Sequence, residues 1–262
     1  LAMLANVWFQ AASNVLNDVG DETIGTDRRN DQRIDPDTGG SRFIQTGILS
    51  QSRMARLGVA LLLVAALAGL ALFFERGPTV LWFGLAGIAL CVFYSLGPVK
   101  LSTIGLGEAA VAIGLGVLPV VGAAWLQGAS IDTALILYSL PVSAWVAAIL
   151  LINEVPDIEA DGACGKDTLP VRLGLDGTSR LYIALQASAF LVILALTVNS
   201  SLPVLAPLVP AGLLLLAWRA SNAIKTGVAE RESMTKGIEA TLAIHTIGCL
   251  WLAACALYSL WW

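Results

Sequence analysis

Charge is scarce in this sequence. Asp, Glu, Lys and Arg make up only 13% of its 262 residues, whereas a soluble domain carries about 25%. Hydrophobic residues account for 57%, and the mean hydropathy is +0.78. Such a composition excludes an ordinary soluble globular domain and predicts an integral, multi-pass membrane protein.

Other features are absent too. The four cysteines form no C-x-x-C pair, which gives no sign of a disulfide framework. The net charge is −4, and no Gly-rich nucleotide loop or interleaving of basic and aromatic residues occurs, so nucleic acid is not an expected partner. No basic segment precedes the first apolar run, which is therefore not a signal peptide. The sequence begins within an apolar run and without Met, so we expect a chain truncated at its N-terminus.

Long apolar runs dominate the sequence. A membrane-spanning helix needs about 20 mostly apolar residues. Seven runs in the sequence are that long, and residues 1–16 have the composition of the end of an eighth helix. The pattern predicts an all-α, polytopic transmembrane helix bundle, built as a single membrane-embedded domain over residues 1–262. The seven full predicted spans are 54–74, 78–96, 104–126, 131–152, 179–198, 201–219 and 237–260.

The distribution of basic residues orients these spans. If each span crosses the membrane once, residues 17–53, 97–103, 153–178 and 220–236 lie on one side, and all but one of the Lys and Arg residues lie there or at the adjoining helix ends. Because Lys and Arg concentrate in cytoplasmic loops, we expect this side to face the cytoplasm, in a bacterial or archaeal inner membrane.

Two acidic clusters lie on that same side, where apolar runs end. In the first, Asn14, Asp18 and Asp21 are spaced by four and three residues, which places them on one helix face, with Asn17 beside them. We expect Gly20 and Gly25 to let the chain turn out of this helix. The acids that follow, from Asp27 to Asp37, are expected to be solvated loop residues.

The second cluster begins Asn153-Glu154-Val-Pro156-Asp157 and continues to Asp161. Asp157 and Asp161 are four apart and share a helix face, and Pro156 favours a helix start or kink. Carboxylates grouped in this way repel one another unless a cation neutralises them. Oxygen ligands of this kind suit Mg²⁺, which completes its coordination shell with water and phosphate oxygens.

These motifs resemble the two aspartate motifs of the UbiA superfamily of intramembrane aromatic prenyltransferases. The first is Asn17-Asp18-Val-Gly-Asp21 followed by Gly25-Thr26-Asp27, and the second runs from Asn153 into Gly165-Lys166-Asp167-Thr-Leu-Pro. Three further segments are similar to the dihydroxynaphthoate branch, which belongs to the menaquinone pathway: Gly165 to Gly174, Tyr94-Ser-Leu-Gly-Pro-Val-Lys100 with Gly105-Leu-Gly-Glu108, and Gly39-Gly-Ser-Arg42 with Gln45.

The resemblance implies a bundle of nine helices, of which about eight are present here and the first is missing. It also implies metal-binding and catalytic roles for Asp18, Asp21, Asp157 and Asp161, with Mg²⁺ as cofactor. Where family members often carry a Lys after the first motif, this chain has Thr23 and Ile24, so more of the diphosphate contact would fall on basic residues elsewhere. The implied substrate-binding residues are Asn14, Asn17, Arg42, Tyr94, Lys100, Glu108, Asn153, Lys166 and Arg172.

The implied reaction transfers a polyprenyl group from polyprenyl diphosphate to an aromatic acceptor, with membrane lipid around the protein. For 1,4-dihydroxy-2-naphthoate as acceptor, the product is demethylmenaquinone. Another acceptor, such as 4-hydroxybenzoate or a chlorophyll-type ring, is an alternative within this class. A secondary transporter is an alternative from another class, but transporters place their sites near the bilayer midplane, and no acid lies deep within any of the seven full spans.

Overall fold

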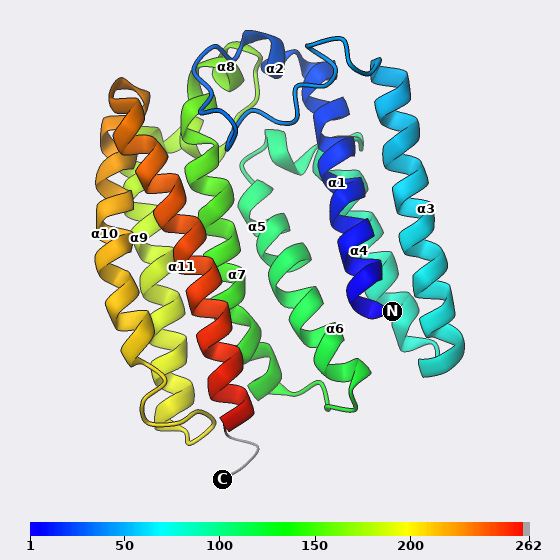
Figure 1. Cartoon of the computed structure of the whole chain (residues 1–262), viewed down its shortest axis with the longest axis vertical. Coiled ribbons are helices and arrows are strands. Elements are labelled where there is room, and N and C mark those ends of the chain that lie inside the picture. The colour runs from blue at the N-terminus through cyan, green and yellow to red at the C-terminus, as the bar shows by residue number, and fades with distance from the viewer. Residues whose placement is uncertain (259–262) are drawn as a thin grey trace. The chain divides into compact units, whose positions relative to one another are not determined.

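The computed structural model describes residues 1–258 of the chain, and within them no strand occurs (Figure 1). The predicted all-α class is therefore confirmed. Helices suit this composition because they satisfy their own backbone hydrogen bonds, which lipid cannot do. Among the described residues, five helical segments are long and apolar enough to cross a membrane: Gln51–Arg76, Gly107–Leu126, Thr133–Ala163, Leu169–Val198 and Leu208–Tyr258.

The chain divides into two compact units, which are described separately. The first consists of Leu1–Ala110 with Asp157–Val171, and the second of Val111–Pro156 with Arg172–Trp262. The two acidic motifs are more than 130 residues apart in the sequence, yet Asp18, Asp21, Asp157 and Asp161 all belong to the first unit. That the whole chain is one domain stays a prediction.

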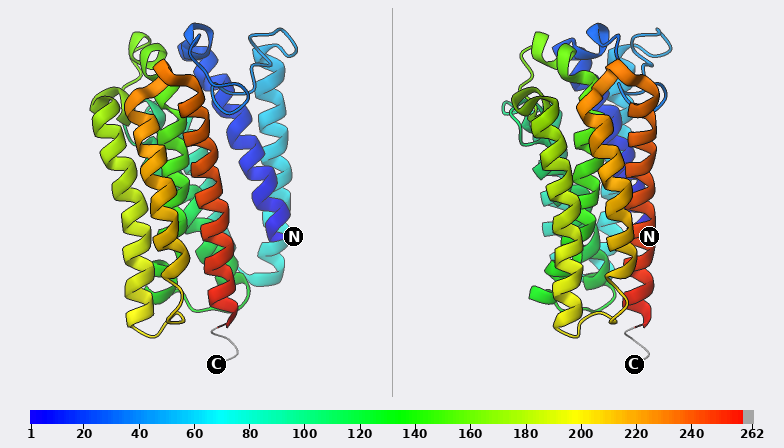
Figure 2. Two further views of the ribbon diagram at one scale, coloured as in Figure 1. Left: turned by 60° about the vertical axis from the view of Figure 1, so that its left-hand side comes forward. Right: turned by 90° about the vertical axis from the view of Figure 1, so that its left-hand side faces the viewer.

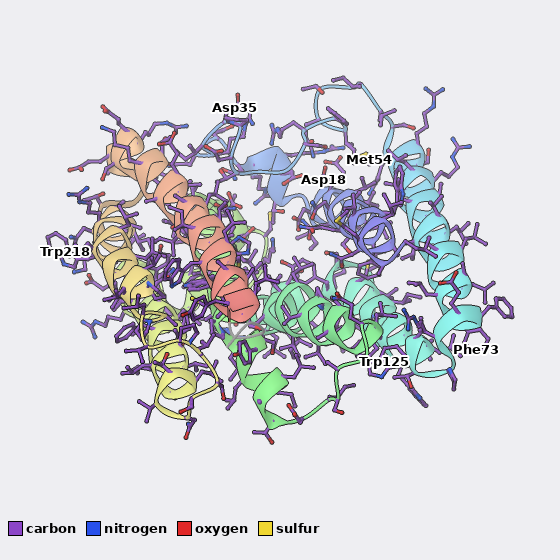
Figure 3. The ribbon with its side chains drawn as sticks, turned by 60° about the horizontal axis from the view of Figure 1, so that its bottom comes forward. Asp18, Asp35, Met54, Phe73, Trp125 and Trp218 are labelled. Carbon is purple, nitrogen blue, oxygen red and sulfur yellow. The ribbon has the colours of Figure 1, made fainter. Side chains whose placement is uncertain are left out.

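Three long helices form most of the first unit, in which α1 packs along α3 (Figure 1). Leu16 of α1 and Met54 of α3 are buried there, and Figure 3 labels Met54 close to the acidic end of α1. Short helices complete the unit at the ends of the long ones. Its elements are α1 (Ala2–Ile24), α2 (Thr26–Arg29), α3 (Gln51–Arg76), α4 (Thr79–Ser95), η1 (Leu101–Thr103), α5 (Gly107–Val111) and α8 (Ile158–Ala163). Of η3 (Val155–Asp157), only Asp157 belongs to this unit.

In the second unit, α10 and α11 are joined by a short turn, pack against each other and run side by side (Figure 2). Tyr182 of α9 and Thr241 of α11 share a hydrogen bond of 2.7 Å between their buried hydroxyl groups. Such bonds help to hold helices together in an apolar interior. The elements of this unit are η2 (Ala112–Val117), α6 (Leu118–Leu126), α7 (Thr133–Asn153), α9 (Leu169–Val198), α10 (Leu208–Thr226), η4 (Gly227–Glu230) and α11 (Arg231–Tyr258).

Several helix boundaries differ from the predicted ones. The span predicted from residue 201 begins at Leu208, because the preceding stretch contains Pro203 and Pro207, which favour non-helical backbone before them. The helix predicted from residue 179 begins at Leu169 and is interrupted at Gly174. The last two residues of the predicted span 237–260 lie outside the described residues.

Candidate functional site

The first acidic motif occupies the last turns of α1. The helix continues past Gly20 to Ile24, so the prediction that Gly20 turns the chain was wrong. The turn comes at Gly25, whose backbone is left-handed (φ 92°) and whose N–H donates to the carbonyl of Asp21. This is the usual way in which a glycine ends a helix. The chain then enters α2, which brings Thr26 and Asp27 back beside Asp21.

The segment after the first motif, residues 29–32, forms hydrogen bonds with the second motif. Asn30 donates a hydrogen bond through its side-chain amide to Oδ1 of Asp157. Beside it, Gln32 Nε2 donates to Oε2 of Glu159 at 3.1 Å, and Arg29 donates to the carbonyl of Ala163 at 3.3 Å. The second motif itself bends at η3, after which α8 begins, as the proline in its sequence predicts.

These contacts line a small cavity in the first unit, with a volume of about 10 Å³. Acids of both motifs line it, although they come from stretches far apart in the sequence. Asp18 does not line it but lies one helical turn from Asp21 on α1, where Figure 3 labels it. The lining residues are Asp21, Thr26, Asp27, Asn30, Asp157, Ala160, Asp161 and Lys166.

Lys166 joins the two motifs directly. Its Nζ lies 3.2 Å from Oδ1 of Asp21 and 3.5 Å from Oδ1 of Asp161. The lysine is only 7% exposed and Asp161 only 1%. Within residues 1–258, Oδ2 of Asp161 is buried and has no hydrogen-bond partner. Leaving a buried polar oxygen unsatisfied is costly, so this oxygen is suited to accept a ligand.

Asp27 belongs to the same site, although the sequence predicted a solvated loop acid. Its side chain is buried, and it lines the cavity. Burial, together with the carboxylates of Asp21, Asp18 and Asp157, raises the pKa of Asp27 to about 7, against the lowering effect of Lys166. A surplus of buried carboxylates is therefore concentrated here. Asp35, by contrast, is exposed as predicted and points outward (Figure 3).

A loop of residues 39–47, here called the capping loop, folds onto the first motif. Ser41 donates to Oδ2 of Asp18 through both its backbone N–H, at 3.2 Å, and its hydroxyl group. Gln45 Nε2 donates to Oε2 of Glu22 at 3.0 Å and to Oδ2 of Asp27 at 3.1 Å. Arg42 donates to the backbone carbonyl of Asp27. The loop therefore supplies neutral donors to acids that would otherwise be buried without them.

The close approach of the capping loop to Asp18 depends on Gly40. Its φ is +68°, and a Cβ at this position would lie 2.7 Å from Oδ1 of Asp18. Arg42 adopts φ +61°, which is uncommon for a residue with a side chain and marks backbone strain of the kind that clusters at functional sites.

Some predicted site residues lie away from the cavity lining. Asn14 is exposed on α1, Tyr94 and Lys100 are half-buried, and Glu108 is buried on α5. Asn153 and Arg172 belong to the second unit and Arg172 is exposed. Asn17 does contact the first motif, since its Nδ2 donates to Oδ2 of Asp21 at 3.0 Å.

Sequence reasoning missed several residues of the site. Thr26 and Asp27 lie within the motif that carried the resemblance, and Gln45 within the pattern of the first loop, so a signal for them existed. Ser41 lies within the same loop pattern as Gln45. Asn30 carried no comparable signal, because a lone amide group in a polar loop is indistinguishable from a solvated one until the fold is known.

The residues present fit a divalent cation. The donors are carboxylate oxygens, which Mg²⁺ prefers, and one of them is buried without a partner. Within residues 1–258, no three Asp, Glu, His or Cys side chains are grouped so that they alone could hold a metal ion. Mg²⁺ is commonly held by one or two carboxylates together with water and substrate phosphates rather than in an all-protein cage. The site matches the arrangement in which water and substrate phosphates complete the shell of the ion.

The helical architecture and the paired aspartate motifs define a class of membrane protein, and comparison with known proteins identifies its family. The model of the UbiA prenyltransferase family matches residues 1–234. This chain belongs to that family. The match extends well beyond residue 180, where the sequence showed only suitable hydropathy.

Two curated relatives illustrate the similarity. The 1,4-dihydroxy-2-naphthoate octaprenyltransferase of Escherichia coli is 34% identical over 202 residues, which cover 75% of this chain and 63% of the relative. The protein of the same name in Haemophilus influenzae is 34% identical over 181 residues, which cover 66% and 56% respectively. The chain thus spans less than two thirds of the length of either relative.

A solved structure, the apo form of a UbiA homolog from Aeropyrum pernix, is similar in fold. Its TM-score is 0.70 at 21% identity, with 95% of this chain and 87% of that chain covered. Together with the long apolar helices, these similarities establish an integral, multi-pass membrane protein.

Proposed function

We propose that this chain is a Mg²⁺-dependent prenyltransferase, which moves a polyprenyl group from polyprenyl diphosphate to 1,4-dihydroxy-2-naphthoate. Membership of the family supports prenyl transfer, and the names of the relatives support this acceptor. The observation that carries the proposal is the cavity where Asp21 and Asp27 of the first motif meet Asp157 and Asp161 of the second around Lys166.

Asp18, Asp21, Asp157 and Asp161 are the proposed metal-binding acids, and Asp27 is added to them from its position in the cavity. One or two of these carboxylates at a time would hold the ion, with water and substrate phosphates completing its shell. When bound, Mg²⁺ supplies positive charge that stabilises the developing charge on the departing diphosphate. Lys166 supplies a further cation, already placed between the two motifs. Arg42 is held beside Asp27 by its hydrogen bond and is the second basic residue at this site.

The chemistry requires heterolysis of the allylic C–O bond, whose electron pair leaves with the diphosphate oxygen. The allylic cation must be kept from water, and burial of the site residues excludes most solvent. The ring carbon that bears the carboxylate then attacks the cation. Loss of CO₂ returns the electrons of the C–C bond to the ring, which gives the hydroquinone form of demethylmenaquinone.

We further propose that the site faces the cytoplasm of a prokaryotic inner membrane. Support comes from the basic residues, since only Arg76 among the Lys and Arg residues is assigned to the opposite side. The polyprenyl tail would lie against lipid-facing apolar helices, which the composition provides.

The test is an assay of membranes that contain the protein, with labelled polyprenyl diphosphate and 1,4-dihydroxy-2-naphthoate. We expect transfer that stops when EDTA removes divalent cations and resumes with Mg²⁺. Asp18→Ala and Asp157→Ala should each abolish transfer while the protein remains inserted. Asp35→Ala is the matched control, because this acid is exposed and outside the cavity.

Full activity in either variant would contradict the proposed mechanism. A panel of acceptors, including 4-hydroxybenzoate, tests the substrate separately. Transfer to 4-hydroxybenzoate in preference to the naphthoate would retain prenyl transfer and overturn the acceptor.

A further inference from the structure

The last residue of α4 contacts the first aspartate motif through a buried hydrogen bond. Ser95 is 3% exposed, and its Oγ donates to Oδ1 of Asn17 at 2.7 Å. Asn17 in turn donates through Nδ2 to Oδ2 of Asp21 at 3.0 Å. The other oxygen of Asp21, Oδ1, is the one that faces Lys166 at 3.2 Å. A chain of three side chains therefore leads from α4 to the cavity.

The chemistry of the groups fixes the direction of this chain. A carboxylate only accepts hydrogen bonds, so the group that Asn17 presents to Asp21 must be its NH₂. The carbonyl oxygen of Asn17 then faces Ser95, and only a donor at that position can satisfy it. Without the hydroxyl group of Ser95, the carbonyl oxygen of Asn17 loses this buried donor, and the amide is held only by its bond to Asp21.

The backbone of α1 shows that this approach is close. A Cβ on Gly20 would lie 2.8 Å from Cβ of Ser95 and 3.1 Å from its carbonyl oxygen. Such distances do not occur in relaxed packing, so α1 and the end of α4 meet here only because residue 20 lacks a side chain. Gly20 therefore contributes to the site by permitting this contact.

We propose that Ser95 is a positioning residue, which acts through Asn17 to orient the Asp21 carboxylate toward Lys166 and the diphosphate-binding cavity. The proposal rests on the proposed function, since it assigns Ser95 a part in that same site. Hydrogen-bond partners that orient a metal-binding group typically contribute ten- to a hundredfold to affinity or activity. Ser95 does not touch the cavity itself, whose lining it does not join.

The test compares Ser95→Ala with Ser102→Ala in the full chain. Ser102 is a suitable control because it is also in the first unit, is 2% exposed, and its Oγ has no hydrogen-bond partner within residues 1–258. The probe is farnesyl thiodiphosphate with Mg²⁺, an analogue that resists ionisation. Binding is followed by the rise in melting temperature that it produces, and kcat/KM for transfer is measured in parallel.

We expect Ser95→Ala to need about tenfold more analogue for half-maximal protection, and to lose about tenfold in kcat/KM, while Ser102→Ala matches the unmodified protein. A double-mutant cycle separates positioning from general damage. Because Ser95 acts through Asn17, the double variant Ser95→Ala with Asn17→Ala should bind the analogue no more weakly than Asn17→Ala alone. The cycle is also measured in kcat/KM, well below all melting temperatures, so a loss of stability in one variant does not obscure it.

Two results would overturn the assignment. One is binding and kcat/KM in Ser95→Ala that equal those of Ser102→Ala, and the other is full additivity of the two substitutions in the cycle. Failure of the unmodified protein to bind the analogue or transfer a prenyl group would instead refute the proposed function, and the role of Ser95 with it.

Discussion

The two acidic motifs meet at one cavity, but the groups that stabilise their buried carboxylates differ. In the first, each aspartate accepts a bond from a neutral donor: Ser41 donates to Asp18, Asn17 of the same helix to Asp21, and Gln45 to Asp27. Asp21 in addition faces Lys166. In the second, Asp157 accepts one such bond, from Asn30. Oδ1 of Asp161 faces Lys166, and its Oδ2 has no hydrogen-bond partner within residues 1–258. Both motifs thus share the charge of Lys166, but the first has more hydrogen bonds from neutral donors than the second. The predictions below test this difference.

The largest effect is expected from removal of the shared cation. Lys166→Met leaves Asp21 and Asp161 buried without their cation, and breaking a buried ion pair in this way costs about 3–5 kcal/mol of stability. We expect a lower melting temperature at neutral pH, which Mg²⁺ together with farnesyl thiodiphosphate partly restores. Lys100→Met is the control, because Lys100 is half-buried and lies outside the cavity lining. Equal melting temperatures for the two variants would contradict a central role for Lys166.

A dependence on pH should follow from the crowded carboxylates. Burial and neighbouring acids raise the pKa of Asp27 to about 7, from an ordinary value of 3.8. A carboxyl group whose pKa is higher in the folded protein binds its proton more tightly when folded. Its contribution to stability is fully present below pH 3.8 and is lost as the pH rises through 7.

Without divalent cations, we therefore expect the free energy of unfolding to fall by on the order of 2 kcal/mol between pH 5 and pH 8. Asp27→Asn, which does not ionise, should reduce this slope without removing it, because burial also raises the pKa of Asp157 to about 7 and that of Asp161 to about 6. Thermal unfolding in detergent across the pH range measures the change. Asp35→Asn serves as the control. A profile that keeps its slope in Asp27→Asn would place the titrating group elsewhere.

The two motifs should also respond in opposite ways to loss of a charge. Asp161→Asn removes a buried carboxylate that has one oxygen without a partner, so we expect the ligand-free protein to gain roughly 1 kcal/mol while Mg²⁺-dependent transfer is lost. Asp18→Asn should instead lose roughly 1 kcal/mol, because an amide can direct an NH₂ group at the Ser41 donors. Unfolding of both variants without metal checks the signs. Stabilisation of both would show that the first motif is no better compensated than the second.

The smallest effect concerns the capping loop. Gly40 and Gly47 both have positive φ, +68° and +75°, but a Cβ at residue 40 would lie 2.7 Å from Asp18 Oδ1, and one at residue 47 would meet nothing within 4 Å. Gly47→Ala should cost about 1 kcal/mol from backbone strain alone. Gly40→Ala should cost the same and in addition weaken binding of the diphosphate analogue. Equal binding in the two variants would show that the loop does not support Asp18.

Much of the fold was predictable because hydropathy reports directly on membrane helices. The apolar runs and the basic residues at their ends predicted the helical class and most spans. The predicted boundaries differ from the observed ones where a proline or glycine interrupts a helix or precedes it, as at Pro207 and Gly174. The division into two compact units had no counterpart in the sequence pattern.

The site was partly predictable for a different reason. Helical spacing placed Asp18 beside Asp21, and the resemblance linked both to Asp157 and Asp161, which now lie in one unit with them. Burial of Asp27 depends on α2 folding back over the cavity and on the capping loop, neither of which spacing reveals. The contact between Ser95 and Asn17 joins two helices far apart in the sequence, so no local pattern could have shown it.

The central claim is that acids of both motifs, with a diphosphate, hold one divalent cation. Electron paramagnetic resonance with Mn²⁺ in place of Mg²⁺ tests it most directly, in the presence of farnesyl thiodiphosphate. We predict one bound Mn²⁺ per chain that shows coupling to phosphorus, and loss of this signal in Asp21→Asn and equally in Asp161→Asn. Binding that survives either substitution, or shows no phosphorus coupling, would contradict the account.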